Sequence, residues 1–239
     1  MRSNKKNQVM RAQIISNKAP FIFVEAYKSL RTNLQFASIS NQYKKIIVTS
    51  SVPGEGKSTV AINLAISLVD SGNKVLLIDS DLRKPMIQKY LHLTNVKGGG
   101  LTNILANTDK AEQCIYFLSD TGLNVITSGP IPPNPAEILG SKKMEDFVKD
   151  LESKFDYIIF DTPPISVVTD AAVLSKLCDG VILVIKQKFA SRESAQLAKR
   201  NLENVGANII GCVLNGFKAE QSSKSYAYYH YKKYDYTYK

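Results

Sequence analysis

A glycine-rich turn at residues 50–59, SSVPGEGKST, has the composition of a polyphosphate-binding loop. Its backbone N–H groups can approach phosphates closely at Gly54 and Gly56, while Lys57 adds a charge and Ser58 a hydroxyl for Mg²⁺. Ser51 replaces the first glycine of the GxxxxGK[ST] pattern, a small residue that the turn tolerates. The alternative, a chance glycine turn, is disfavoured because the turn lies between a strand-like run and a helix-like stretch. The residues expected to bind ATP here are Pro53, Gly54, Glu55, Gly56, Lys57, Ser58 and Thr59.

Three aspartates follow two strand-like runs. Asp79 and Asp81 end the run LLIDSD, with Arg83 close behind, and Asp161 ends YIIFD before a rigid Thr-Pro-Pro. The carboxyl ends of parallel strands meet at one edge of a sheet, so these carboxylates should face the phosphate loop. In P-loop enzymes such a strand-end acid holds Mg²⁺ together with the loop serine, here Asp161 with Ser58.

The pair Asp79 and Asp81 exceeds what one metal ion needs. One of the two can therefore orient a hydroxyl nucleophile and take its proton, and the tyrosine hydroxyl, with a pKa of about 10, benefits from such a base. The sequence leaves open which aspartate is the base, and the alternative for both is a loop-start or capping role. The predicted catalytic residues are Lys57, Asp79, Asp81 and Arg83, and the predicted metal ligands are Ser58, Asp81 and Asp161.

The last 14 residues contain seven of the chain's twelve tyrosines. They are Tyr226, Tyr228, Tyr229, Tyr231, Tyr234, Tyr236 and Tyr238. No aliphatic residue larger than Ala227 follows Phe217, so residues 218–239 are predicted to be a flexible tail that offers its tyrosines as substrates. Extended, it reaches about 70 Å, far enough for its own site or a neighbour's. The alternative is an aromatic tail that stacks on a sugar, a nucleic acid or a protein.

The composition is that of a globular protein of 239 residues, with 44% apolar and 22% charged residues. Cys114, Cys178 and Cys212 show no pairing or metal spacing and are expected to be small core residues in a reducing compartment. No apolar run approaches the roughly 20 residues of a membrane span, and the basic start lacks a signal-peptide core, so a cytoplasmic location is predicted. The net charge of +10 fits a solvated basic surface, an acidic or membrane-bound partner, or nucleic acid.

Strand-like and helix-like segments alternate along the chain. A basic, flexible leader over residues 1–24 precedes a helix over residues 25–37, and the domain is expected to extend to residue 217. Strands are predicted at 45–49, 74–79, 123–127, 157–161, 181–185 and 208–214. One apolar stripe of Met144, Phe147, Val148 and Leu151 and another of Ala195, Ala198, Leu202 and Val205 indicate two further helices. The fold class is therefore α/β, a doubly wound, mostly parallel sheet with helices on both faces.

The combined motifs resemble those of the bacterial tyrosine kinases of capsule and exopolysaccharide synthesis, in the form that is a separate cytoplasmic protein. The resemblance extends from about Glu25 to the end of the chain. It rests on SSVPGEGKST, LLIDSDLRKP, IIFDTPP, SGPIPPNPAEIL, VLNGF and the tyrosine cluster. It implies a P-loop fold of the deviant Walker type, ATP with Mg²⁺, and autophosphorylation of the tail tyrosines between subunits of a ring.

The resemblance also implies partners. These are the cytoplasmic segment of a membrane adaptor that controls polysaccharide chain length, which recruits the kinase to the inner face of the membrane, and a cognate tyrosine phosphatase; no nucleic acid is expected. Ring contacts in the family use a Glu and two Arg on the leading helix, and here Glu25, Lys28 and Arg31 have that spacing. Lysine lacks the bidentate fork of arginine. By similarity, Asn215 is placed near adenine.

Two other classes of protein compete with this interpretation. Partitioning-type P-loop ATPases share the fold and both acidic motifs, but they use a second lysine early in the loop, where this chain has Val52, and do not normally end in tyrosines. A scaffold or nucleic-acid-binding module that merely holds ATP would fit the basic charge, although no recognition motif supports it.

Overall fold

The computed structural model describes residues 14–94 and 99–217, which fold around one seven-stranded sheet. The strands are β1 (Lys45–Ser50), β2 (Val75–Asp79), β3 (Tyr116–Leu118), β4 (Leu123–Ile126), β5 (Tyr157–Asp161), β6 (Gly180–Lys186) and β7 (Ile209–Asn215). Their order is β3-β4-β2-β5-β1-β6-β7, and only β3 runs antiparallel to its neighbour. The predicted doubly wound, mostly parallel sheet is confirmed.

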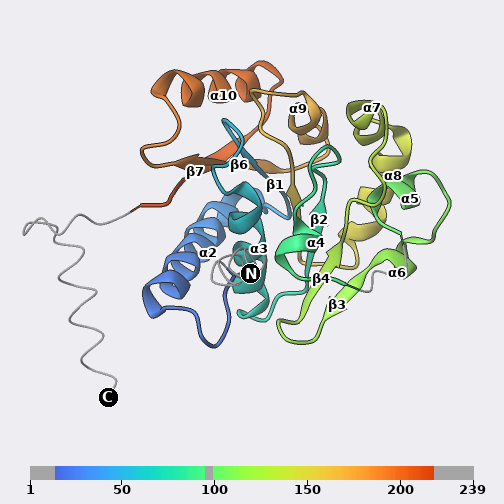
Figure 1. Cartoon of the computed structure of the whole chain (residues 1–239), viewed down its shortest axis with the longest axis horizontal. Helices are drawn as coiled ribbons and strands as arrows, with labels where there is room; N and C mark the ends of the chain where they lie inside the picture. Colours follow the sequence, from blue (N-terminus) through green and yellow to red (C-terminus); the bar gives the residue numbers. More distant parts are fainter. Residues whose placement is uncertain (1–13, 95–98, 218–239) are drawn as a thin grey trace, which may run out of the picture.

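Helices cover both faces of this sheet (Figure 1). On one face lie α2 (Phe21–Asn41), α3 (Lys57–Val69) and α4 (Ile87–Tyr90). On the other lie α5 (Leu101–Leu105), α7 (Pro135–Leu139), α8 (Lys142–Glu152), α9 (Asp170–Ser175) and α10 (Arg192–Asn204), while the short α6 (Ala111–Cys114) leads into β3. No helix in the described ranges is both long and apolar enough to cross a membrane.

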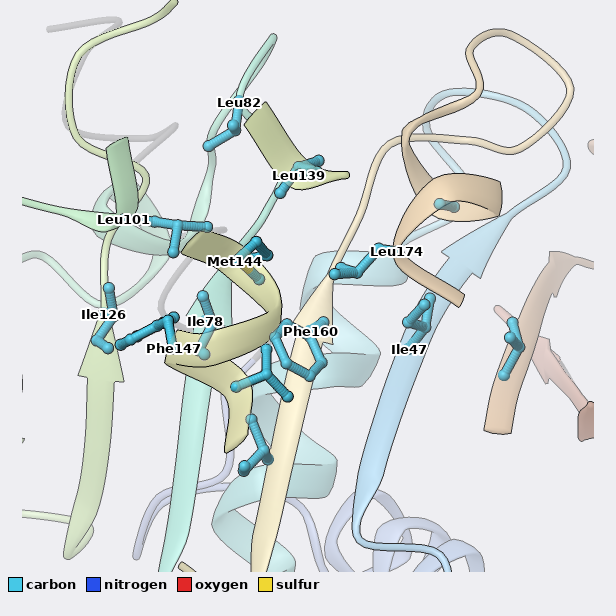
Figure 2. Close-up of a cluster of buried hydrophobic side chains, with 14 of the residues drawn as sticks. Ile47, Ile78, Leu82, Leu101, Ile126, Leu139, Met144, Phe147, Phe160 and Leu174 are labelled. Carbon is cyan, nitrogen blue, oxygen red and sulfur yellow. The ribbon is translucent and has the colours of Figure 1, made fainter. Parts of the chain in front are cut away.

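The central strands are apolar on both sides because both sides are covered. Every residue of β2 is buried, and Phe160 of β5 has no exposed surface. Figure 2 shows Phe160 among side chains from α8 and α9, including Met144 and Leu174. Burying one such large apolar side chain stabilises the fold by about 1.5–3 kcal/mol. The carboxyl ends of these strands are therefore held rigidly.

The helix α8 illustrates how the sequence sets an element. Ser141 caps its start, since the side-chain oxygen accepts a hydrogen bond from the Met144 N–H at 3.2 Å. The predicted stripe of Met144, Phe147, Val148 and Leu151 is buried along its whole length. The helix consequently packs onto the sheet through that stripe.

The leading helix is longer than predicted, and the folded part begins before residue 25. α2 starts at Phe21, after Pro20, and ends at Asn41. Ile15 is buried, and its N–H donates to Asn63 Oδ1 at 2.7 Å. Residues 14–24 were expected in a flexible leader; instead, Phe23 and Val24 pack against the core beside α3.

Three further details correct the expectations from sequence. The short edge strand β3 was not predicted, because only three residues form it and Phe117 at its centre is exposed. Val205 is not part of the buried α10 stripe; it follows the last residue of that helix and is 37% exposed. Cys212 is exposed rather than a core residue, because β7 lies at the edge of the sheet.

Candidate active site

The phosphate loop connects β1 to α3 and has the backbone conformation that its glycines permit. Gly54 and Gly56 have φ angles of 90° and 92°, in the left-handed region. α3 begins at Lys57 and is 13 residues long, so its unpaired N-terminal N–H groups and its dipole are directed at the loop. Ser58 and Thr59 lie in its first turn. This is the cradle that a polyphosphate requires.

Two side chains hold the loop from inside. Glu55 is fully buried; its Oε2 accepts hydrogen bonds from the Ser51 hydroxyl (2.7 Å) and the Val52 N–H (2.8 Å), and its Oε1 from the Lys186 N–H (3.0 Å). Asn215 Nδ2 donates to the Glu55 carbonyl at 2.7 Å. The side chain of Glu55 therefore stabilises the loop from inside. If this residue contacts a phosphate, it does so through its backbone N–H.

The sheet brings the predicted carboxylates together. Asp79 and Asp161 are register partners at the ends of β2 and β5. Lys57 Nζ lies 2.9 Å from Asp81 Oδ2, 3.4 Å from Asp161 Oδ1 and 3.3 Å from Ser58 Oγ. The loop lysine thus pairs with two carboxylates, one at the end of β5 and one just after β2.

Burial and proximity shift the ionisation of these groups. Burial raises the pKa of Asp79 to about 8, and the nearby Asp161 adds to the effect. Burial also raises the pKa of Asp161, which Lys57 and a hydrogen bond from Ser58 oppose. Burial disfavours the Lys57 ammonium, but Asp161 and Asp81 outweigh it and raise the lysine pKa above its usual value. A buried cluster of shifted groups beside a phosphate loop is typical of a catalytic site.

The donor set also fits Mg²⁺. Asp161 Oδ2 is buried without a hydrogen-bond partner, beside the Ser58 hydroxyl. Among the described residues, no three His, Cys, Asp or Glu side chains are grouped to hold a metal by themselves. Mg²⁺ commonly takes one or two protein oxygens, with phosphate oxygens and water completing an octahedron, so the set is consistent with this ion.

A cavity of about 350 Å³ opens between the phosphate loop and the segments that follow β2 and β5. Its polar lining includes Lys57, Ser58, Asp81 and Arg83, whereas Asp79 is buried behind it. Asp79 instead accepts hydrogen bonds from the backbone N–H groups of Asp81 (3.3 Å) and Ile87 (3.0 Å). Of the two neighbouring aspartates, only Asp81 faces the cavity.

Comparison with known proteins identifies the family. Residues 43–209 match the model of the AAA domain. The tyrosine-protein kinase YwqD of Bacillus subtilis (strain 168) is 41% identical over 229 residues, 96% of this chain and 95% of YwqD. The chain belongs to the bacterial tyrosine kinases of capsule and exopolysaccharide synthesis.

Solved structures agree with this assignment. The kinase superposes on the chimerical protein CapA2B2 with a TM-score of 0.79 and 35% identity, over 84% of this chain and 87% of that one. The septum site-determining protein MinD of Pyrococcus horikoshii, complexed with Mg-ADP, has a TM-score of 0.62 and 25% identity, over 77% and 75% of the two chains. The fold is thus shared with the partitioning-type ATPases, whereas the family of the chain is that of the kinases.

In the kinase, Arg83 is held by a residue that the sequence analysis missed. Its Nε and a terminal nitrogen each lie 2.9 Å from an oxygen of Asp170, the first residue of α9. The Asp170 side chain is fully buried, and that of Arg83 is 40% exposed. No pattern in the sequence links Arg83 to Asp170, so the sequence did not indicate this pair.

The three residues expected to form ring contacts have partners within the described chain. Lys28 Nζ lies 2.7 Å from Glu25 Oε1 on the same helix. Arg31 donates to the Ser67 carbonyl at 2.7 Å and so joins α2 to α3, although its Nε is buried without a hydrogen-bond partner. A ring contact through Arg31 therefore remains a prediction.

The predicted phosphoacceptors, Tyr226 to Tyr238, lie outside the described residues, as do residues 1–13 of the expected leader. Asn215 is within the described residues, and its side chain donates a hydrogen bond to the Glu55 carbonyl in the phosphate loop. The expected contact of Asn215 with adenine stays a prediction.

Proposed function

We propose that this kinase transfers the γ-phosphoryl group of ATP to the tyrosines of its own tail, acting between neighbouring subunits. The observation that carries the proposal is the cluster of Lys57, Asp81 and Asp161 at the mouth of the phosphate loop. It offers a cation for the transferred phosphoryl group, a carboxylate for Mg²⁺ and a second carboxylate for the acceptor. The seven tyrosines that follow residue 225 supply that acceptor.

Each group has a separate role in the transfer. Loop N–H groups and Lys57 bind the phosphates, so the ammonium moves from its carboxylate partners toward the β- and γ-phosphates as ATP enters. Ser58 and Asp161 would hold Mg²⁺, which neutralises phosphate charge when bound. Arg83, paired with Asp170, keeps the segment after β2 in place and leaves part of its guanidinium exposed at the cavity.

Asp79 and Asp81 have different roles in the transfer. The tyrosine oxygen forms a bond to the γ-phosphorus while the bond to the β-phosphate oxygen breaks, and the phenolic proton passes to Asp81. Asp79 positions Asp81, because Oδ1 of Asp79 accepts a hydrogen bond from the Asp81 N–H. Departure of ADP leaves phosphotyrosine on the tail.

Phosphorylation of the tail would change the charge of the whole chain. Seven phosphotyrosines add roughly −10 to −14, enough to cancel or reverse the formal +10. Such a change can separate subunits or release an acidic partner. We therefore assign to the kinase a ring that assembles and dissociates with tail phosphorylation, a membrane adaptor that holds it at the inner face of the membrane, and a phosphatase that resets it. Its output is the regulation of polysaccharide synthesis and export.

The decisive test uses γ-labelled ATP, Mg²⁺ and the full chain. The wild type should label tail peptides, and Lys57→Met should not, since the charge at the γ-phosphate is lost. Glu203→Gln is the matched control; Glu203 forms an exposed ion pair with Lys199 at 3.2 Å, remote in sequence from the phosphate loop. Undiminished labelling by Lys57→Met would refute the site assignment.

A mixing experiment tests whether transfer occurs between subunits. Lys57→Met, with its tail intact, is combined with a chain in which the seven tail tyrosines are phenylalanine. Label on the Lys57→Met tail indicates transfer between subunits. Labelling of the wild type without any label in this mixture would instead establish transfer within one subunit.

A further inference from the structure

The cavity at the active site has a second lining that neither the phosphates nor Mg²⁺ use. Beside its polar residues, it is lined by Met86 and Tyr90 from the segment after β2 and by Pro164, Val167 and Val168 from the segment after β5. These five side chains are called the acceptor wall below. An anionic triphosphate gains nothing from an apolar surface, so the wall is suited to another part of the reacting complex.

We propose that the acceptor wall binds the aromatic ring of the tyrosine to be phosphorylated, and so selects tyrosine over serine and threonine. This inference rests on the proposed function. The ring would contact the wall while its hydroxyl reaches Asp81, which lines the same cavity. A serine or threonine hydroxyl is separated from its backbone by a single carbon, so it would reach Asp81 only by bringing polar backbone into contact with the apolar wall.

The wall is rigid enough to select by shape. The Pro163 carbonyl accepts a hydrogen bond from the Thr49 hydroxyl at 2.8 Å, and the Ile165 N–H donates to the Ser50 carbonyl at 3.0 Å. These bonds fix the segment after β5 against β1. The wall is thereby held in a constant position relative to the phosphate loop, which begins where β1 ends.

The same carboxylate holds the other half of the wall and the proposed base. Asp79 accepts the N–H groups of both Asp81 and Ile87, and Ile87 follows Met86 of the wall. The Tyr90 N–H in turn donates to the Met86 carbonyl at 3.0 Å. One buried group therefore sets the distance between the ring subsite and Asp81, as transfer to a rigid acceptor requires.

The occupant to which we commit is a tail tyrosine of a second copy of this chain, in keeping with the proposed transfer between subunits. The chain continues for 22 residues beyond Phe217, and seven of these are tyrosines. Val167 lines the cavity and is 59% exposed, so a ring that enters from solvent can contact it directly. Its exposure also makes it the best position for a substitution, because the folded core does not depend on it.

The test uses the full chain with its seven tail tyrosines changed to alanine, so that its own tail offers no ring to the wall and an added peptide, SYAYYHYKKYDYTYK, is the acceptor. Val167→Asp should raise the KM for this peptide by about tenfold, equivalent to about 1.4 kcal/mol, and leave the KM for ATP within about twofold. Val205→Asp is the matched control, since Val205 is also exposed but does not line the cavity. A peptide with serine in place of every tyrosine should not be phosphorylated by the parent chain.

Three results would contradict the binding of a tyrosine ring to the acceptor wall. A rise in the KM for ATP that equals or exceeds the rise for the peptide would place the nucleotide base on the wall and overturn the inference. An unchanged peptide KM, or equal phosphorylation of the serine peptide, would also overturn it. If the parent chain does not phosphorylate the tyrosine peptide, or a Lys57→Met version does, the proposed function fails first, and that result is distinguishable from failure at the wall alone.

Discussion

Replacing Glu55 should destabilise the kinase even though this residue lies in a surface loop. Its carboxylate accepts two backbone N–H groups and one hydroxyl, and the side chain has no exposed surface. A buried donor that loses its acceptor costs about 1–3 kcal/mol. Glu55→Gln keeps one carbonyl oxygen and abandons about one N–H, so the free energy of unfolding should fall by about 1–3 kcal/mol. Glu55→Ala abandons both N–H groups and should cost about 2–6 kcal/mol.

Urea unfolding followed by circular dichroism measures these differences, and Glu203→Gln is the control. Glu203 forms an exposed ion pair, so its replacement should cost less than about 1 kcal/mol. Glu55→Gln should also weaken ATP binding about tenfold or more, because the loop is no longer held in its binding geometry. Equal stability of Glu55→Gln and the wild type would refute the role of Glu55 as the internal brace of the loop.

Three other substitutions each remove or obstruct a single contact. Gly56→Ala should weaken ATP binding and lower the melting temperature, because φ is 92° and the added carbon would lie 2.2 Å from Asn215 Nδ2; an unchanged melting temperature would contradict this. Arg83→Met should lower the free energy of unfolding by about 3 kcal/mol and Asp170→Asn by about 1 kcal/mol, because only Arg83→Met leaves the buried Asp170 carboxylate unpaired. A larger loss for Asp170→Asn by urea titration would exclude the unpaired carboxylate as the cause. Arg31→Met removes the hydrogen bond to the Ser67 carbonyl of α3, so the free energy of unfolding of the isolated subunit should fall by about 1 kcal/mol in the same titration. An unchanged free energy of unfolding would mean that Arg31 does not stabilise the subunit and would leave the ring contact as its role.

The sequence predicted the bounds of an element best where a continuous apolar run marks a buried strand and polar or rigid residues mark its end. β5 has the predicted bounds because an uninterrupted apolar run ends at Asp161 and Thr-Pro-Pro. The grouping of Asp79, Asp81 and Asp161 near Lys57 was also predictable, since parallel strands that carry acids at their ends place those acids at one edge.

The sequence did not reveal two kinds of contact. One joins residues that are far apart in the chain, and the other is made by a side chain that points away from the site its motif suggests. Arg83 and Asp170 are 87 residues apart, and neither belongs to a pattern that pairs them. Glu55 lies within a motif known for phosphate contacts, yet its carboxylate is turned toward the N–H of Lys186, which is 131 residues away. The different roles proposed for Asp79 and Asp81 likewise depend on which of these two buried side chains lines the cavity.

Mass spectrometry of the C-terminal peptide shows directly whether Lys57 and the carboxylates around it phosphorylate the tail. The full chain is incubated with Mg²⁺ and ATP, with Lys57→Met treated in parallel. We expect phosphate on tyrosines between Tyr226 and Tyr238 in the wild type and none in Lys57→Met. ATP consumption by the wild type with every tail tyrosine unmodified would contradict tail phosphorylation at this site.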